Sequence, residues 1–215
     1  MTHKYKLVGA FCINALIVVF EIIALILSLR DQGLDSFFFY TQDSNYLAMA
    51  VSLLFCVCSA KAIRGQGELP TWLHPLRYIS VSCLMLTFFV VLFVLMPAMG
   101  ADGPLMLYRG SMLYQHTLCP ILSVVSFFVL EPDSKLSKSD IKKALLPTLL
   151  YAGVAILLNL ARVIEGPYFF LMVYAQPWYM SVLWCGIVLG IAWFLAAAVW
   201  KLHNVIYQKS APARC

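Results

Sequence analysis

Several strongly apolar stretches of this sequence carry polar side chains near one end, and two of these have the chemistry of a nucleophile and its base. Thr41 carries a hydroxyl, and the His116 imidazole can take the hydroxyl proton as the oxygen attacks a carbonyl carbon. Asn45 or Gln42 could donate hydrogen bonds to the oxyanion that forms. Cys119, one helical turn from His116, is an alternative nucleophile. These residue types predict nucleophilic attack on a carbonyl carbon.

Two further polar residues, Glu21 and Asn159, lie in other apolar stretches and are candidates for orienting the reacting groups. Glu21 could hold the His116 imidazole, or it could pair with Arg30 or Arg162, which approach from the same side. Single residues also have simpler interpretations, because a threonine in an apolar helix often bonds its own backbone and a histidine can link two helices. Several polar groups at one depth in a membrane favour a functional cluster, since each is costly there.

The elements that must position these residues are six long apolar helices. Of the 215 residues, 62% are hydrophobic and 12% are charged, which is about half the charged fraction of a soluble domain. About 20 apolar residues in a helix cross a bilayer core. The first stretch is too long for the apolar core of a signal peptide, so we expect a retained span. We predict an all-α, polytopic membrane protein with a single domain, 1–215, and spans near 7–29, 38–60, 76–98, 112–130, 144–163 and 179–203.

Lysine and arginine gather on one side of the predicted membrane. Twelve of the 15 lie within residues 1–6, 61–77, 131–143 and 201–215, whereas Arg30, Arg109 and Arg162 fall on the other side. Both chain ends are therefore expected in the cytoplasm. The net charge of +5 is split among short segments and forms no basic helix. We therefore expect anionic lipid headgroups, and not nucleic acid, as its partner.

Depth along each span follows from the helical rise of about 1.5 Å per residue. Thr41 comes out roughly 5 Å and His116 roughly 6 Å below the outer face, and Asn45 and Glu21 lie deeper, at roughly 10–12 Å. Thr41 and Asn45 share one helix face at spacing i,i+4. Pro120 removes a backbone hydrogen bond and can kink the helix near His116. We therefore expect a small polar pocket in the outer half of the bundle.

Two windows, together with the six-span plan, resemble the androgen-induced protein family, which includes the androgen-dependent TFPI-regulating protein. The windows are residues 39–45, FYTQDSN, and residues 115–122, QHTLCPIL. The resemblance implies intramembrane hydrolysis of fatty-acyl esters, such as fatty acid esters of hydroxy fatty acids, with Thr41 and His116 as the threonine and histidine of the reaction. The DSN triplet at 43–45 is more similar to bacterial relatives, which implies a bacterial cytoplasmic membrane.

Other functions stay open at this point. A non-enzymatic lipid- or cation-binding or transport protein could use the same pocket, with Glu21 and Asp43 as negative charges, and a receptor or assembly factor could use polar residues only to join helices. We expect no cofactor and no metal site, because Cys56 and Cys58 form C-x-C without a second pair nearby. The aromatic stretch 166–179 is either an interfacial aromatic belt or a lip that admits a lipid chain.

Overall fold

The computed structural model describes residues 3–131 and 134–210, and these form helices and loops without a strand. The predicted all-α fold is therefore confirmed for the described chain. Pro132 and Asp133, at the expected end of the fourth span, and Arg214, counted among the cytoplasmic charges, lie outside the described residues. The elements are α1 (His3–Gln32), η1 (Gly33–Phe38), α2 (Tyr40–Ile63), α3 (Leu73–Val90), η2 (Val91–Leu95), α4 (Met96–Ala98), η3 (Gly100–Leu107), η4 (Leu113–Leu118), α5 (Cys119–Val125), η5 (Ser126–Leu130), α6 (Lys138–Leu160), η6 (Phe169–Leu171) and α7 (Trp178–Ser210).

Six helical stretches of the described chain are long and apolar enough to cross a membrane. They are Lys4–Phe38, Tyr40–Ile63, Leu73–Ala98, Leu113–Leu130, Lys138–Leu160 and Trp178–Ser210. Each contains most of one predicted span. One clear difference is at α6, which begins at Lys138 and not near residue 144, because Ser137 and Asp140 form a reciprocal capping box at its first turn.

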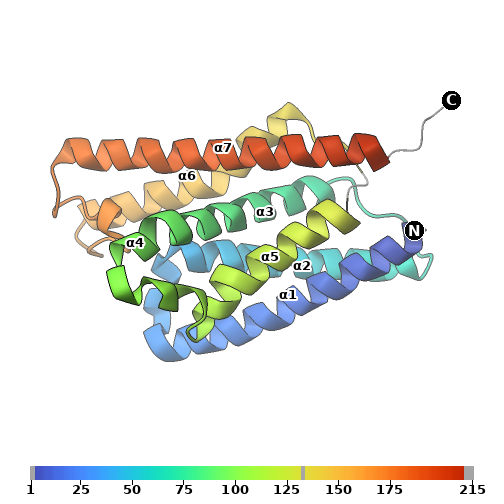
Figure 1. Ribbon diagram of the computed structural model, residues 1–215, viewed down its shortest axis with the longest axis horizontal. Helices are drawn as coiled ribbons and strands as arrows, with labels where there is room; N and C mark the ends of the chain where they lie inside the picture. Colours follow the sequence, from blue (N-terminus) through green and yellow to red (C-terminus); the bar gives the residue numbers. More distant parts are fainter. Residues whose placement is uncertain (1–2, 132–133, 211–215) are drawn as a thin grey trace.

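The helices form one bundle in which α3 is central, since α3 contacts α2, α5, α6 and α7. α1 packs on α2 and on α5, and α6 packs on α7 (Figure 1). Both ends of the described chain lie at the same end of the bundle (Figure 1). We call this the termini end, and we call the opposite end, where η1 and η3 lie, the site end.

The fourth span departs from regular α-helical geometry on both sides of its centre. It consists of a π-helical turn, η4, then the short α5, then a second π-helical turn, η5. Pro120 has no N–H to donate to the His116 carbonyl four residues earlier, so the regular α-helical ladder is interrupted there. The expected disturbance near His116 thus takes the form of a π-helical turn, a feature that is frequent at functional sites.

A buried ion pair joins three of the spans near the termini end. Arg77 in α3 donates two hydrogen bonds, each 3.0 Å long, to the two carboxylate oxygens of Glu131. Asn14 of α1 and Ser126 of η5 also donate to Glu131 Oε1. Arg77 was expected in a cytoplasmic loop facing headgroups, and this expectation is wrong because α3 begins at Leu73 and buries the whole side chain.

The electrostatics of this pair favour an ionised carboxylate. Burial alone would raise the pKa of Glu131, but the Arg77 guanidinium and the hydrogen bonds from Ser126 and Asn14 hold it below its ordinary value. A low-dielectric interior tolerates a buried carboxylate when an arginine binds both of its oxygens and other donors satisfy its remaining lone pairs. The pair therefore fixes α3 against η5 and α1.

Candidate functional site

Two cavities meet at Thr41 at the site end of the bundle. The first, the apolar cavity, has a volume of about 320 Å³ and lies among α2, α3, α6 and α7, with Leu86, Ile156 and Val188 in its wall. The second, the histidine cavity, also has a volume of about 320 Å³, and His116, Gln42 and Met106 line it. Thr41 and Tyr168 line both cavities. A ligand group at Thr41 can therefore extend into either space.

The Thr41 side chain is buried, and its hydroxyl points to a partner outside its own helix. Tyr168 Oη lies 3.4 Å from Thr41 Oγ1 and accepts a hydrogen bond from the Thr41 backbone N–H at 3.1 Å. A threonine in an apolar helix usually donates to a backbone carbonyl of its own helix. Within the described residues Thr41 Oγ1 makes no such bond to a carbonyl of α2. The hydroxyl is therefore not occupied by its own backbone.

The His116 imidazole is fixed in one tautomer. Its Nδ1 lies 2.8 Å from the Met106 carbonyl oxygen, and because a carbonyl only accepts, Nδ1 must carry the hydrogen. The other ring nitrogen, Nε2, is buried and has no hydrogen-bond partner among the described residues. Thr117 donates to the neighbouring Leu107 carbonyl at 2.7 Å, so two consecutive side chains of η4 hold the end of η3. Nε2 therefore keeps its lone pair, as a general base requires.

An amide network ties α1, α2 and η4 together behind the site. Gln42 Oε1 accepts hydrogen bonds from the Gln115 amide and the Ser28 hydroxyl. Asn45 Nδ2 donates to the Thr41 carbonyl at 2.6 Å and to the Gln115 carbonyl at 3.2 Å. Both Asn45 N–H groups are thus used by the backbone, whereas the Gln42 NH₂ group has no partner among the described residues and Gln42 lines the histidine cavity. Of the two amides, only Gln42 therefore keeps its NH₂ group available at the histidine cavity.

Glu21 and Cys119 lie together away from both cavities. Glu21 is fully buried beside the Cys119 thiol, but the two groups do not meet the geometry of a hydrogen bond. The expected role of Glu21 in holding His116 is wrong, because the Met106 carbonyl occupies Nδ1. Glu21 also has no partner among the described arginines, which excludes the alternative pairing with Arg30 or Arg162.

Asn159 positions a loop and does not face Thr41. Its Nδ2 donates to the Ile164 carbonyl at 2.9 Å, and its Oδ1 accepts from the Val173 N–H at 3.0 Å. Both bonds brace residues 161–177, the segment between α6 and α7. Gly166 in this segment has a φ of +98°, and a Cβ there would lie 3.0 Å from the Leu171 carbonyl oxygen, so only glycine fits without strain. Asn159 and Gly166 therefore shape the segment that carries Tyr168.

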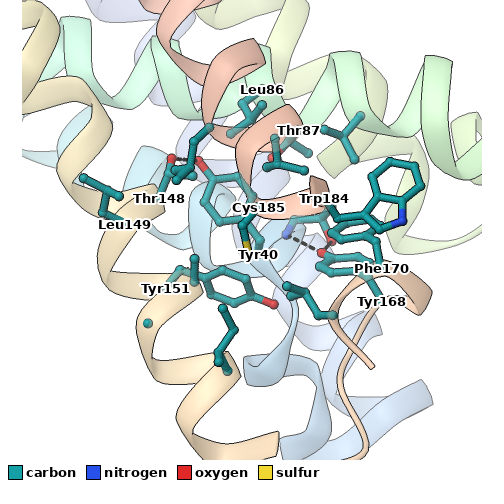
Figure 2. Close-up of a pocket in the computed structure, with 18 residues that line it drawn as sticks. Tyr40, Leu86, Thr87, Thr148, Leu149, Tyr151, Tyr168, Phe170, Trp184 and Cys185 are labelled. Atoms are coloured by element: carbon teal, nitrogen blue, oxygen red, sulfur yellow. Dashed lines mark hydrogen bonds between the residues drawn. The ribbon is translucent and has the colours of Figure 1, made fainter. Parts of the chain in front are cut away.

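The aromatic stretch folds inward at this point. Tyr168, Phe170 and Trp184 group on one side of the apolar cavity, facing Thr148, Leu149 and Tyr151 of α6 (Figure 2). The Tyr168 and Phe170 rings stack with centroids 5.1 Å apart and an interplanar angle of 7°. Trp178 and Tyr179, in contrast, are exposed. One part of the stretch therefore closes the cavity, and the other lies on the surface as an interfacial belt would.

No group of three or more metal-binding side chains occurs in the part of the chain that the structure describes. Thr41 and Tyr168 lie where the two cavities meet, whereas Gln42 and the His116 imidazole, whose Nε2 has no partner among the described residues, line the histidine cavity. No protein-family model, curated protein or solved structure matches this chain. The proposal below is therefore argued from the residues and their geometry.

Proposed function

We propose that this protein is an intramembrane hydrolase of fatty-acyl esters, such as fatty acid esters of hydroxy fatty acids, with Thr41 as the nucleophile and His116 as the general base. One observation carries the proposal. Thr41 and His116 line the same cavity, and the His116 tautomer leaves Nε2 unprotonated and without a partner among the described residues. A hydroxyl needs such a base in order to attack an ester at neutral pH.

The reaction follows from this proton arrangement. Thr41 Oγ1 attacks the ester carbonyl carbon while its proton passes to His116 Nε2, and the carbonyl electron pair moves onto oxygen. The Gln42 NH₂ group can donate to that oxygen. The intermediate then expels the alcohol, which takes the proton from His116, and leaves an acyl group on Thr41. Water then attacks the acyl-threonine while His116 takes its proton, and the bond between the acyl carbon and Thr41 Oγ1 breaks as His116 returns that proton to Oγ1, which releases the fatty acid.

The cavities support a substrate with two apolar arms. An ester carbonyl at Thr41 would extend one arm into the apolar cavity and the other into the histidine cavity, and each has a volume of about 320 Å³. Volumes of this size are at the lower end of the range for small-molecule pockets. The apolar wall that includes Leu86 and Val188 suits an acyl chain, and the more polar histidine cavity suits the alcohol side.

The proposed orientation has both chain ends in the cytoplasm, in a bacterial cytoplasmic membrane. Helices that carry predicted cytoplasmic lysines, such as Lys4, Lys61, Lys138 and Lys209, start or finish near the termini end (Figure 1). A bias of this kind favours that end as the cytoplasmic one. The Thr41 site would then lie in the outer half of the bilayer.

A lipid- or cation-binding protein without catalysis is the competing function. The two acidic residues that could bind a cation, Glu21 and Asp43, do not line the cavities at Thr41. Glu21 lies beside Cys119, and Asp43 lines a separate crevice between α2 and α6 with Leu150 and Val154. Neither carboxyl lines the cavities that meet at Thr41, so the charge arrangement favours the hydrolase.

The test compares ester turnover by wild type, Thr41→Val and His116→Ala reconstituted in nanodiscs. The substrates are nitrophenyl esters of graded chain length and fatty acid esters of hydroxy fatty acids. Both substitutions are expected to lower kcat at least about 10³-fold. Thr71→Val, in an exposed loop, and His74→Ala, at the termini end, are matched controls and should retain turnover per folded protein. Turnover within about twofold of wild type in both site variants would overturn the proposal.

A further inference from the structure

Tyr168 lies beside the nucleophile but belongs to none of the six spans. It lies in residues 161–177, between α6 and α7, and its side chain is nevertheless buried. Stacking on Phe170 and an edge contact with Phe39, with centroids 5.8 Å apart, hold the ring in place. The phenol oxygen is thereby fixed at the wall that the two cavities share.

The hydrogen bonds around Tyr168 define the direction in which it donates. Its Oη accepts from the Thr41 N–H at 3.1 Å, so the phenolic hydrogen is free to point at Thr41 Oγ1, 3.4 Å away. If Oγ1 accepts from Tyr168, the threonine hydrogen is left for another acceptor, and His116 Nε2 on the same cavity is one without a partner among the described residues. A donor chain from phenol to hydroxyl to imidazole would form if Thr41 Oγ1 and His116 Nε2, which make no hydrogen bond to each other here, came within hydrogen-bond distance.

The phenol also keeps its proton under working conditions. Burial raises the pKa of Tyr168 to about 12, and an oxygen that is buried costs less as a neutral donor than as an anion. Tyr168 is therefore a neutral hydrogen-bond donor at neutral pH.

We propose that Tyr168 is a catalytic donor of this site, which stabilises the negative charge that forms first on Thr41 Oγ1 and then on the carbonyl oxygen of the ester. This inference rests on the proposed function. As Thr41 loses its proton to His116, Tyr168 donates to Oγ1. When Oγ1 bonds to the carbonyl carbon, the carbonyl oxygen comes within reach of the same phenol. Tyr168 keeps its own proton throughout, so no additional acid or base is needed.

Tyr168 comes from the segment 161–177, and not from the helices that carry Thr41 and His116. In the proposed site, α2 carries the nucleophile Thr41 and η4 carries the base His116. The donor Tyr168 lies in a loop that hydrogen bonds from Asn159 hold in place and whose turn requires Gly166. Charge stabilisation would therefore depend on the 161–177 segment being folded over the cavity.

The first test is Tyr168→Phe, which keeps the stacked ring and removes only the hydroxyl. We expect kcat for ester hydrolysis and the rate of fluorophosphonate labelling to fall about 10- to 10³-fold, with KM changed by less than about threefold. Tyr78→Phe is the matched control, because Tyr78 is also a buried phenol with one hydrogen bond, to the Ala196 carbonyl, at 2.7 Å. It should leave kcat unchanged.

The second test separates a donor from a structural role. Replacing Tyr168 by a fluorinated tyrosine lowers the phenol pKa without changing its shape. The alkaline limb of the kcat profile should then move to lower pH by the difference between the two phenol pKa values, and the same replacement at Tyr78 should not move it. If Tyr168→Phe unfolds at a lower temperature, its loss of activity could be structural, and the shift of the alkaline limb then distinguishes a donor role of Tyr168 from a structural one.

The outcomes distinguish the two proposals. If Thr41→Val is inactive but Tyr168→Phe has wild-type kcat and the fluorinated protein an unchanged alkaline limb, the role of Tyr168 is wrong and the hydrolase stands. If Thr41→Val keeps wild-type turnover, the proposed function fails, and the role of Tyr168 fails with it.

Discussion

His116 donates its Nδ1 hydrogen to the carbonyl oxygen of Met106, which lies 2.8 Å away in η3. A backbone carbonyl cannot titrate, so this bond holds the imidazole in one tautomer without adding a second ionisable group. In the proposed reaction, the Met106 carbonyl would orient the His116 imidazole as a carboxylate does in many hydrolytic triads.

The first prediction concerns that tautomer. Selective ¹⁵N labelling of histidine, with assignment of His116 by comparison with His116→Ala, should show a protonated Nδ1 and an unprotonated Nε2 in the resting protein at neutral pH. The reason is that only a ring N–H can bond the Met106 carbonyl. A spectrum with the hydrogen on Nε2 would contradict the assignment and leave Thr41 without a base.

The second prediction concerns the segment that supplies the carbonyl. Gly103 in η3 lies so close to α4 that a Cβ there would collide with the Met96 carbonyl oxygen. Gly103→Ala should therefore push η3 away from α4, lengthen the His116–Met106 bond and lower fluorophosphonate labelling about tenfold or more. Gly190→Ala in α7 is the control, because a Cβ there meets no atom within 4 Å. Equal labelling of the two variants would contradict the prediction.

The third prediction concerns acyl-chain length. Ala152 of α6 lines the apolar cavity, and Ala152→Phe would fill part of it. We expect kcat/KM for long acyl chains to fall about tenfold or more while short chains are little affected, since pocket contacts of this size are worth about 1–3 kcal/mol. Ala198→Phe, on an exposed face of α7, should leave the chain-length profile unchanged. A uniform loss across chain lengths in Ala152→Phe would argue that the cavity does not hold the chain.

The fourth prediction concerns the buried pair at the termini end. The pKa of Glu131 is lowered in the folded protein, so its contribution to stability is present above the ordinary carboxyl pKa and is lost as pH falls through the lowered value. Glu131→Gln leaves Arg77 buried without a counter-charge and should cost about 3–5 kcal/mol at neutral pH.

Thermal unfolding in nanodiscs between neutral pH and about pH 3 measures this effect. Wild type should lose stability on acidification more steeply than Glu131→Gln, which has already lost the pair. Glu165→Gln, on the exposed surface of the 161–177 segment, serves as a charge-matched control and should follow wild type. A parallel pH dependence of wild type and Glu131→Gln would show that the pair does not carry the acid sensitivity.

Hydropathy was sufficient to predict the six helices, because a bilayer-length apolar run has few alternatives to a helix. The start of α6 at Lys138 was also predictable from the sequence, since Ser137 and Asp140 have the spacing of a capping box. Arg77 was misplaced for a different reason. Hydropathy treats each charge as costly on its own, whereas the cost falls when a partner such as Glu131, distant in sequence, pairs with it.

The site was only partly predictable. Helical rise gives the depth of Thr41 and His116 but not the direction in which Glu21 or Asn159 faces, and those two candidates point elsewhere. Tyr168 could not be singled out among the neighbouring aromatic residues. Its position depends on how a loop folds back over the bundle, and that is set by tertiary contacts such as the Phe170 stack and by the positive φ of Gly166.

The most direct test of the central claim is the identity of the residue that becomes acylated or phosphonylated. Wild-type protein is treated with a fluorophosphonate, digested, and analysed by tandem mass spectrometry. The account predicts an adduct on the Thr41 hydroxyl that is absent in Thr41→Val and at least about 10³-fold slower to form in His116→Ala. An adduct on Cys119, or continued ester turnover with Thr41 unmodified, would contradict it.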